Sequence, residues 1–517
     1  MAWSTAIFSA ATGLSRILGL AREIVARSYF GVEGAGINAF TVAFQVPNLV
    51  RALVADAALS SAFVPVFTEL LEKGERARAW RVASSLIWLL LLGLTAVTAV
   101  FVLAAPWVMS LFGYGGEDGD LAVTLARILF PIVVLLGISG VIVGILNSYE
   151  HFTVPALTPV AWNLVIIAGL VIGVPQANSD DAKLYVYAGA IVVGTVVQLL
   201  LPLPWLAGRD GRLRVAIDWR DPAVKRVFVL MLPVTLGLGL INVNALIGTF
   251  FAARFIDPTI SPSAIDAAFR IYMLPQGMFS VAVATVLFPA LARLATRGDD
   301  DGFRHTVGLG LRQIAFLLIP ASAVSAVLAE PIVRLLYERG EFGPHETDVV
   351  AAALAAFSLG LVFNGAMLML NRAFFSLQAP WFPTWVALGN LVLNTVLFAV
   401  LYRVGTWGIP LAISLANMAG SAALLLLLRR RFGRFEIGET SRSAFLVTLA
   451  SAVLAAVAYG VWWTLDDVLG RTFPAQLVSV GAAMAAGGAA YLFSARLLGV
   501  RELNALLSLR SRARPAA

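Results

Sequence analysis

Arginines lie inside stretches of this chain that are otherwise apolar enough to cross a membrane, among them Arg16, Arg22, Arg51 and Arg270. An arginine at the centre of a membrane helix costs about 2.5–3.5 kcal/mol even on a lenient insertion scale, so these side chains must face something polar. A guanidinium group binds phosphate and carboxylate oxygens with bidentate geometry. The set therefore indicates the binding of an anionic substrate in a water-accessible cavity.

The first apolar stretch, 4–28, places two of these arginines deep in the membrane. Arg16 lies about 12 residues, or roughly 18 Å, from either end. Arg22 follows six residues later, a rotation of about 120°, whereas Glu23 returns almost to the face of Arg16. This stretch either lines a broad cavity, or one arginine points at a neighbouring helix.

The other two arginines have polar neighbours at helical spacing. The second stretch carries a polar stripe that consists of Thr41, Gln45, Asn48 and Arg51, followed by Asp56. Such a stripe serves substrate binding or hydrogen bonding between helices, and both roles stay open. Asp266 precedes Arg270 by four residues, which suits an i,i+4 ion pair and leaves a structural role open there too.

Composition excludes a soluble fold. The 517 residues are 60% hydrophobic and 13% charged, whereas soluble domains average about 25% charged residues. The net charge of +7 lies in short loops and not in one basic domain, so we expect no nucleic-acid partner. The absence of cysteine excludes disulfides and thiol chemistry.

Fourteen apolar windows of spanning length predict an all-α polytopic membrane protein with about 14 transmembrane helices. We interpret the first window as a retained helix and not as a signal peptide. Lysine and arginine concentrate after the second, sixth and twelfth windows, which places both termini in the cytoplasm by the positive-inside rule. The windows are 4–28, 36–68, 82–109, 121–147, 157–175, 184–206, 225–252, 265–292, 306–329, 347–371, 382–402, 407–428, 444–464 and 475–498.

The chain contains a weak copy of itself. Pro65 near the end of the second window leads to Gly74, just as Pro289 near the end of the eighth leads to Gly298. The two prolines are 224 residues apart, and so are the two glycines. Because six windows separate equivalent helices, this predicts two parallel six-helix lobes plus two extra C-terminal helices. We expect an N-terminal lobe at 1–208, a C-terminal lobe at 209–432, and windows 13 and 14 with a basic cytoplasmic tail at 433–517.

Motifs for enzymatic chemistry do not occur in the sequence. There is no Walker loop, no nucleophile elbow and no His-Glu-x-x-His sequence. The three histidines, His151, His305 and His345, are far apart, so we expect no metal site. We therefore predict a transporter without a cofactor and not an enzyme.

Three ordered motifs within about 50 residues resemble those of the MurJ (MviN) family of lipid II flippases: SRILGLARE at 15–23, NAF at 38–40 with VPNLVR at 46–51, and AFVP at 62–65. RIY at 270–272 is similar to a motif of that family's eighth span. The resemblance implies the multidrug, oligosaccharidyl-lipid and polysaccharide exporter fold, with a cationic central cavity and an extra helix pair that forms a groove for a polyprenyl tail.

The resemblance also implies site residues. The family's functional arginines fall on Arg16, Arg22, Arg51 and Arg270, and the supporting groups are Glu23, Asn48, Asp56 and Asp266. An aspartate often found near the start of the second span is Asn38 here. Sodium-binding carboxylates proposed for some members fall near Asn242 or Asn244 and near Asn390 and Asn394, all neutral. We therefore expect the membrane potential, and not sodium, to drive transport.

The function that the resemblance implies is movement of lipid II from the inner to the outer leaflet of the bacterial cytoplasmic membrane by alternating access. Its partners would be lipid II, membrane lipids and other proteins of cell-wall synthesis. Three alternatives stay open. They are a flippase for another undecaprenyl-pyrophosphate-linked saccharide, a multidrug cation exporter of the same fold, and a non-transporting scaffold of cell-wall synthesis.

Overall fold

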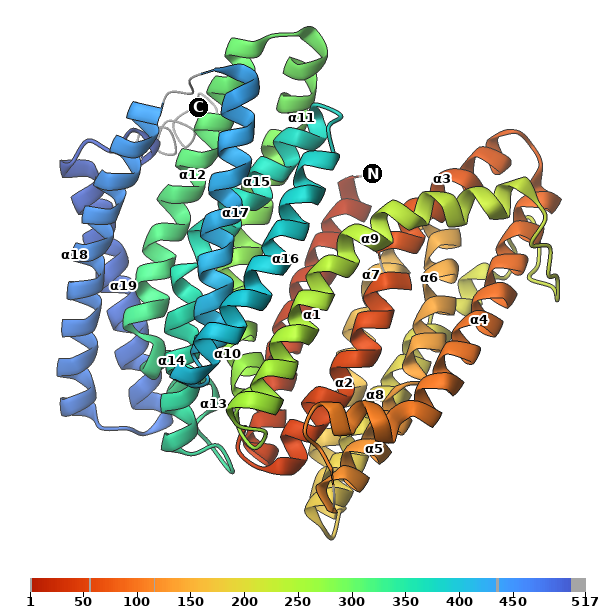
Figure 1. Cartoon of the computed structure of the whole chain (residues 1–517), viewed down its shortest axis with the longest axis horizontal. Helices are drawn as coiled ribbons and strands as arrows, with labels where there is room; N and C mark the ends of the chain where they lie inside the picture. The colour runs from red at the N-terminus through yellow and green to blue at the C-terminus, as the bar shows by residue number, and fades with distance from the viewer. Residues whose placement is uncertain (1, 55–56, 116, 434–436, 504–517) are drawn as a thin grey trace. The chain divides into compact units, whose positions relative to one another are not determined.

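The structure is a computed structural model that describes residues 2–54, 57–115, 117–433 and 437–503. These residues form helices α1 to α19, joined by turns and short π or 3-10 segments, and contain no strand (Figure 1). The predicted all-α class is therefore confirmed.

The chain divides into two compact units. Unit 1 comprises Met1–Ser263 and Arg339–Phe342, and unit 2 comprises Ala264–Glu338 and Gly343–Ala517. The helices of unit 1 are α1 (Ala2–Phe30), α2 (Ala35–Val54), α3 (Ala57–Glu72), α4 (Arg76–Leu111), α5 (Glu117–Leu129), α6 (Ile132–Ser148), α7 (Thr153–Ala168), η1 (Gly169–Gly173), η2 (Val174–Gln176), α8 (Asp180–Leu200), η3 (Leu203–Leu206), α9 (Pro222–Phe251) and η4 (Ala252–Ile256). Helix α10 (Ser261–Pro275) begins in unit 1 and continues into unit 2.

Unit 2 holds the remaining helices, which are η5 (Gln276–Ser280), α11 (Val281–Arg297), α12 (Asp300–Val327), α13 (Ala329–Tyr337), α14 (Pro344–Leu359), α15 (Leu361–Ser376), α16 (Trp381–Leu401), η6 (Tyr402–Val404), α17 (Gly408–Phe432), α18 (Ile437–Leu469) and α19 (Phe473–Leu497). In Figure 1 they run from green to blue.

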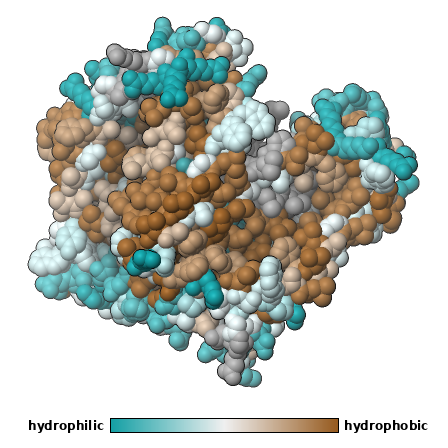
Figure 2. All heavy atoms as spheres, viewed as in Figure 1, coloured by the Kyte–Doolittle hydropathy of each residue, from teal (hydrophilic) through white to brown (hydrophobic). Residues whose placement is uncertain are grey.

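Ten helices in the described residues are long and apolar enough to cross a membrane, and the bent pair α14–α15 makes up to eleven. Figure 2 shows apolar side chains along the flanks of the helices and hydrophilic ones at their ends. The other three predicted windows coincide with α1, with α2 and α3, and with α9. The count of fourteen spans stays a prediction.

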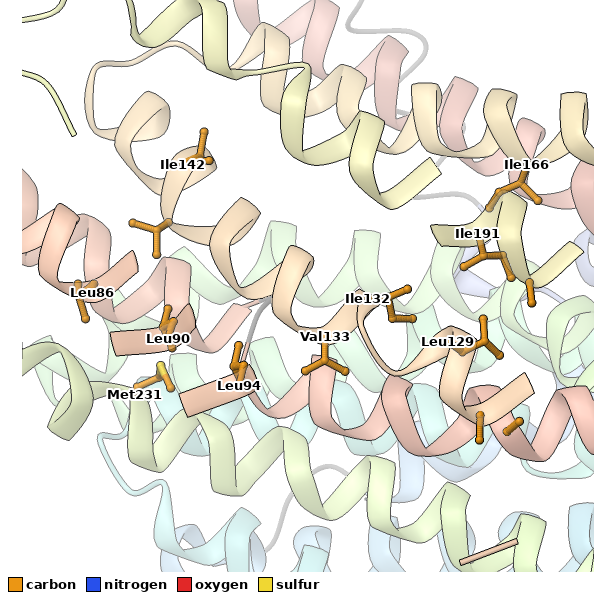
Figure 3. Packing of buried hydrophobic residues seen from close by; sticks show 14 of the residues in the cluster. Leu86, Leu90, Leu94, Leu129, Ile132, Val133, Ile142, Ile166, Ile191 and Met231 are labelled. Atoms are coloured by element: carbon orange, nitrogen blue, oxygen red, sulfur yellow. The ribbon is translucent and has the colours of Figure 1, made fainter. Parts of the chain in front are cut away.

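The core of unit 1 is built on regular helical spacing. Leu86, Leu90 and Leu94 are four residues apart, so they lie on one face of α4, which packs against Val133 and its neighbours on α6 (Figure 3). At Gly137 of α6, an added Cβ would lie 2.4 Å from the Leu94 Cδ1 atom. A larger residue would force the Leu94 side chain to shift, so glycine favours this close approach of the two helices.

In unit 2, α18 and α19 pack on each other, and α18 lies beside α12 (Figure 1). Arg334 on α13 fastens one end of α18. Its side chain is 5% exposed, pairs with Glu330, and lies 3.6 Å from both the Glu338 and the Asp466 carboxylates. Because a buried arginine without carboxylate partners is strongly destabilising, this cluster holds the end of α18 on α13.

A second buried arginine fastens the opposite end of the same helix. The Arg312 guanidinium on α12 lies 3.8 Å from the Glu439 carboxylate, in the first turn of α18, and 3.4 Å from the Glu502 carboxylate beyond α19. The side chains of Arg312 and Glu502 are 10% and 5% exposed. The pair α18–α19 is therefore fixed to unit 2 at both ends.

The boundary between the two compact units differs from the boundary that the internal repeat predicts. Helix α9 packs against α2, α3 and α4, and so belongs to unit 1 although it follows the predicted boundary at 208/209. The repeat is defined by similar sequence, whereas the units are defined by which helices pack together. The division into 1–208, 209–432 and 433–517 stays a prediction.

Candidate functional site

The Arg22 side chain is oriented by three neighbours. Its Nη2 atom donates to Glu23 Oε1 at 2.6 Å and its Nη1 atom donates to Asn163 Oδ1 at 3.3 Å. The guanidinium carbon lies 4.8 Å from the centre of the Trp162 ring, a cation–π geometry. With its side chain 12% exposed, Arg22 is a charged group held in one orientation inside an apolar helix.

Asn163 supports this arrangement from α7, which packs against α1. Its amide nitrogen donates to the Pro159 carbonyl at 2.9 Å and to the Ser15 carbonyl at 3.4 Å, so its oxygen is turned toward Arg22. Asn163 and Trp162 were not predicted from the sequence. The signal available in the sequence was a polar amide within an apolar window, the same kind of signal that identified the arginines.

Arg27 is a further buried arginine, which was not predicted from the sequence as a site residue. It is 4% exposed, and its Nη2 atom lies 4.0 Å from the carboxylate of Glu23, which is itself 7% exposed. Glu23 therefore lies between Arg22 and Arg27. The i,i+4 spacing of Glu23 and Arg27 was visible in the sequence, but Arg27 falls at the end of the first window, where a basic residue is ordinary.

Arg16 differs from Arg22 in its surroundings. Its side chain is exposed, and no hydrogen bond or ion pair joins it to another residue in the described part of the chain. Its charge faces outward from α1, as a direct contact to an anion requires.

Arg51 is oriented by an amide of the same helix. Its Nε and Nη2 atoms donate to Asn48 Oδ1 at 3.1 and 2.8 Å. Two N–H groups directed at one amide oxygen fix the direction of the guanidinium. The predicted supporting carboxylate, Asp56, lies outside the described residues.

In unit 2, Arg270 forms the i,i+4 ion pair that its spacing with Asp266 indicated. The Nη2 and Nε atoms of Arg270 lie 3.1 and 3.4 Å from the Asp266 carboxylate. The two side chains are 38% and 27% exposed. The structure thus joins Arg22 to Glu23 and Arg270 to Asp266 within separate units.

Asn38 connects the beginnings of α2 and α10. The side chain is fully buried, and its Nδ2 atom lies within hydrogen-bond distance of the Val32, Gly34 and Thr259 carbonyls. Its Oδ1 atom accepts from the Ser263 backbone nitrogen at 2.9 Å, in the first turn of α10. An amide can both donate and accept here, whereas a carboxylate could only accept.

The four asparagines at the positions considered for sodium offer neutral oxygens. Asn394 is 5% exposed and its Oδ1 atom is buried without a partner, as is the Oδ1 atom of Asn244. The Asn390 amide lies 3.5 Å from the Met367 sulfur. Among the residues that the structure describes, no group of three or more His, Cys, Asp or Glu side chains could hold a metal ion.

Comparison with known proteins finds a matching family model and related sequences. The family model described as lipid II flippase MurJ matches residues 26–480. A Vibrio cholerae protein named probable lipid II flippase MurJ is 32% identical over 515 residues, which cover 96% of this chain and 95% of the relative. A Burkholderia cenocepacia protein named lipid II flippase MurJ is 31% identical over 466 residues, which cover 88% of each chain.

Solved structures show the fold. A structure titled lipid II flippase MurJ, inward closed conformation, superposes with a TM-score of 0.77 at 24% identity and covers 96% of this chain and 99% of that chain. An inward-facing transporter of the MATE family, of the MOP superfamily, superposes with a TM-score of 0.70 at 18% identity and covers 83% of this chain and 98% of that chain.

Proposed function

Because the chain belongs to the lipid II flippase MurJ family, we propose that it moves lipid II, the lipid-linked precursor of peptidoglycan, from the inner to the outer leaflet of the bacterial cytoplasmic membrane. It is a transporter and not an enzyme. The observation that carries the proposal is the buried guanidinium of Arg22, which Glu23, Asn163 and Trp162 hold in one orientation within an apolar helix.

Arg22 suits a pyrophosphate group. Its two terminal nitrogens each use one N–H group on Glu23 and Asn163, and a guanidinium has five N–H groups in all. Its Nε atom is buried without an acceptor among the described residues. An unsatisfied buried donor costs about 1–3 kcal/mol. A phosphate oxygen that accepted from this group after a small side-chain rotation would remove that cost.

Arg16 and Arg51 contribute charge in two different ways. Arg16 is exposed near the middle of the first window and makes the direct contact. Arg51, oriented by the Asn48 amide, supplies a second guanidinium from α2. In a low-dielectric setting such charges attract an anion strongly.

Arg270 is the arginine of unit 2 for which we propose a pyrophosphate contact. It is paired with Asp266 at 3.1 Å in a half-exposed site. A pyrophosphate that bound Arg270 would compete with the Asp266 carboxylate for the same N–H groups. The ligand would therefore bind more tightly when Arg270 is released from Asp266 than when the two are paired. A ligand can shift a conformational equilibrium only through such a difference in affinity.

We propose fourteen spans in two parallel six-helix lobes with both termini in the cytoplasm. Ten or eleven of these spans have helices that meet length and apolarity criteria. Helices α1 and α9, and α2 with α3, supply the other three. The loops rich in lysine and arginine support the orientation.

The membrane potential is the proposed driving force. Each elementary charge that crosses it corresponds to about 2.3 kcal/mol per 100 mV, and Arg16, Arg22 and Arg51 would carry positive charge through part of the field. The neutral side chains of Asn244, Asn390 and Asn394 give little charge compensation for sodium.

The MATE-like fold makes a multidrug cation exporter the main rival in mechanism. A cation site needs carboxylates that face the substrate, whereas Glu23 and Asp266 are both engaged with arginines. A flippase for another undecaprenyl-pyrophosphate saccharide would use the same pyrophosphate contact. A scaffold would use the same ion pairs structurally, but would not need an exposed Arg16.

The test is depletion of the protein in its host, followed by measurement of the lipid-linked precursors in the inner leaflet. We expect lipid II to accumulate there. Accumulation of a different polyprenyl-linked saccharide would show that this saccharide lipid, and not lipid II, is the substrate. If purified protein in vesicles moves no lipid-linked precursor at all, the transport function is wrong and the scaffold alternative holds.

A further inference from the structure

The connector between η3 and α9 carries a surface that the proposed function does not use. Residues 209–220, which we call the strap, run without helix or strand along the first three turns of α4 (Figure 1). The backbone nitrogen of Arg214 donates to Ser84 Oγ at 3.1 Å, and the backbone nitrogen of Asp218 donates to Ser85 Oγ at 3.2 Å. The strap is therefore bound to α4 and has a defined path.

That path descends along α4 and returns. At Gly211, an added Cβ would lie 2.4 Å from the Trp80 ring, so the backbone rests on that ring. Further along, the Trp88 indole nitrogen donates to the Arg214 carbonyl at 3.2 Å. The eight residues from Trp80 to Trp88 rise about 12 Å along α4.

The strap returns to the first turn of α4 at its end. Both oxygens of the Asp221 carboxylate accept from Arg78, at 3.2 Å each. The deepest part of the strap is therefore the segment from Arg214 to Asp218.

The strap turns an apolar row, at and just after its deepest segment, away from α4. Val215, Ile217 and Trp219 are 77%, 51% and 57% exposed, whereas Ala216 and Asp218 between them are half-buried. Alternation with a period of two is what an extended segment shows when one face packs and the other points outward. The row is thus a consistent face of the strap and not a single exposed residue.

The apolar row lies where the flank of α4 becomes lipid-facing. Leu92 and Leu103 on α4 are 54% and 79% exposed, as expected of side chains that meet lipid chains. Trp88, which holds Arg214, lies one turn before Leu92. Tryptophans at this position in a span mark the boundary between lipid chains and head groups. The row therefore lies at the head-group level.

Arginines flank the row. Arg212, Arg214 and Arg220 are exposed, and the Arg220 guanidinium lies 5.0 Å from the centre of the Trp219 ring. Basic side chains beside exposed aliphatic and tryptophan side chains are typical of segments that bind an anionic membrane surface.

We propose that the strap is a membrane-surface anchor, which inserts Val215, Ile217 and Trp219 among the head groups of an anionic leaflet and places its arginines on lipid phosphates. The anchor binds bilayer lipid and not the transported substrate, so it goes beyond the proposed function. Because the strap is bound to α4, it fixes the height of this end of α4 against the leaflet.

The chain has no cysteine, so single labels can be placed without background. An environment-sensitive fluorophore on Ile217→Cys, in full-length protein in nanodiscs with an anionic lipid, should show blue-shifted emission and strong quenching by lipid-borne spin labels. The matched control is Glu72→Cys, an exposed position before α4, which should report water. Water-like emission at 217 would overturn the proposal, and it is also the result expected if a partner protein covers the row in cells.

A second variant tests the charge. Replacing Arg212, Arg214 and Arg220 by glutamine leaves the backbone bonds of the strap to Ser84 and Ser85 unchanged. Quenching at 217 should then become equal in anionic and neutral nanodiscs, whereas the unmodified strap should be quenched more in anionic ones. An anionic preference that persists in the glutamine variant would refute the role of the arginines.

Discussion

The side-chain oxygen of Asn38 accepts a hydrogen bond from the backbone nitrogen of Ser263, a residue 225 positions later in the chain. This separation differs by one residue from the 224-residue displacement of the internal repeat. The first turns of α2 and α10 therefore meet at nearly equivalent positions of the two copies. Thr41 and Ser263 add a second contact, with their hydroxyl oxygens 2.8 Å apart.

Replacing Asn38 by aspartate should weaken this junction. The amide donates toward three carbonyls, whereas a carboxylate would face the same carbonyl oxygens without a proton. We expect the free energy of unfolding to fall by about 3 kcal/mol, measured by thermal unfolding of purified protein. The control Thr41→Ala, which removes one hydroxyl contact, should cost about 1 kcal/mol. Equal stability of Asn38→Asp and the unmodified protein would contradict this account.

Arg16 and Arg27 should respond differently to alanine. Arg16 is exposed, so Arg16→Ala should abolish flipping while stability changes by less than about 0.5 kcal/mol. Arg27 is 4% exposed beside Glu23, so Arg27→Ala should cost about 3–5 kcal/mol of stability. Flipping assays and unfolding curves on both variants check this. An unstable, degraded Arg16→Ala protein would favour a structural role for that residue.

Conservative charge replacement at Arg22 should also abolish most transport. Lysine keeps the charge but cannot bind Glu23 and Asn163 through separate nitrogens while it stacks on a ring. We expect Arg22→Lys, and likewise Arg270→Lys, to lose about tenfold or more in flipping rate, which corresponds to about 1.4 kcal/mol. Arg226→Lys, at an exposed ion pair with Glu69, is the matched control and should flip normally. Normal flipping by both Arg22→Lys and Arg270→Lys would refute a direct pyrophosphate contact.

Transport should follow the membrane potential and not a sodium gradient. Asn244, Asn390 and Asn394 provide neutral oxygens where sodium would need carboxylates. In reconstituted vesicles we expect flipping with an imposed potential and none with a sodium gradient at zero potential. Robust transport in the second condition would mean that an unidentified carboxylate completes a sodium site.

Docking of the strap should survive mild acid. Burial raises the pKa of Asp221, but hydrogen bonds from Arg78 and the Ala223 nitrogen outweigh burial and hold the pKa below its usual value of 3.8. A lowered pKa contributes stability above pH 3.8, and this contribution is lost as the pH falls through the folded-state pKa. Hydrogen exchange of residues 209–221, corrected for intrinsic rates, should show constant protection down to about pH 5. Asp221→Asn should reduce that protection at neutral pH, and a loss near pH 6 in the unmodified protein would contradict the assignment.

Much of the helical architecture could be predicted from the sequence because apolar windows are long and uninterrupted. Each predicted window coincides with a helix or a helix pair, and the i,i+4 pair of Asp266 and Arg270 is present. The bend of 43° between α14 and α15 was not predictable from apolarity. It occurs at Gly360, where an added Cβ would lie 2.7 Å from the Ser414 Cα atom, so it depends on a neighbouring helix.

The buried arginines mark the limit of sequence reasoning. Arg312 lies inside an apolar window just as Arg16 does, yet it pairs with Glu502, 190 residues away. Arg334 pairs with Asp466 across 132 residues. Residue type alone does not distinguish an arginine that has a distant carboxylate from one that faces a substrate. Only packing separates the two classes.

Arg312 and Arg334 also ensure that α18 moves together with the rest of unit 2. Their partners on α18, Glu439 and Asp466, are 27 residues apart, or about 40 Å along a helix. A helix that is bound at two distant points cannot tilt independently of the helices that bind it, here α12 and α13. A pair of spectroscopic labels, one on the exposed face of α18 and one on unit 1, would therefore measure the motion of a whole unit during transport.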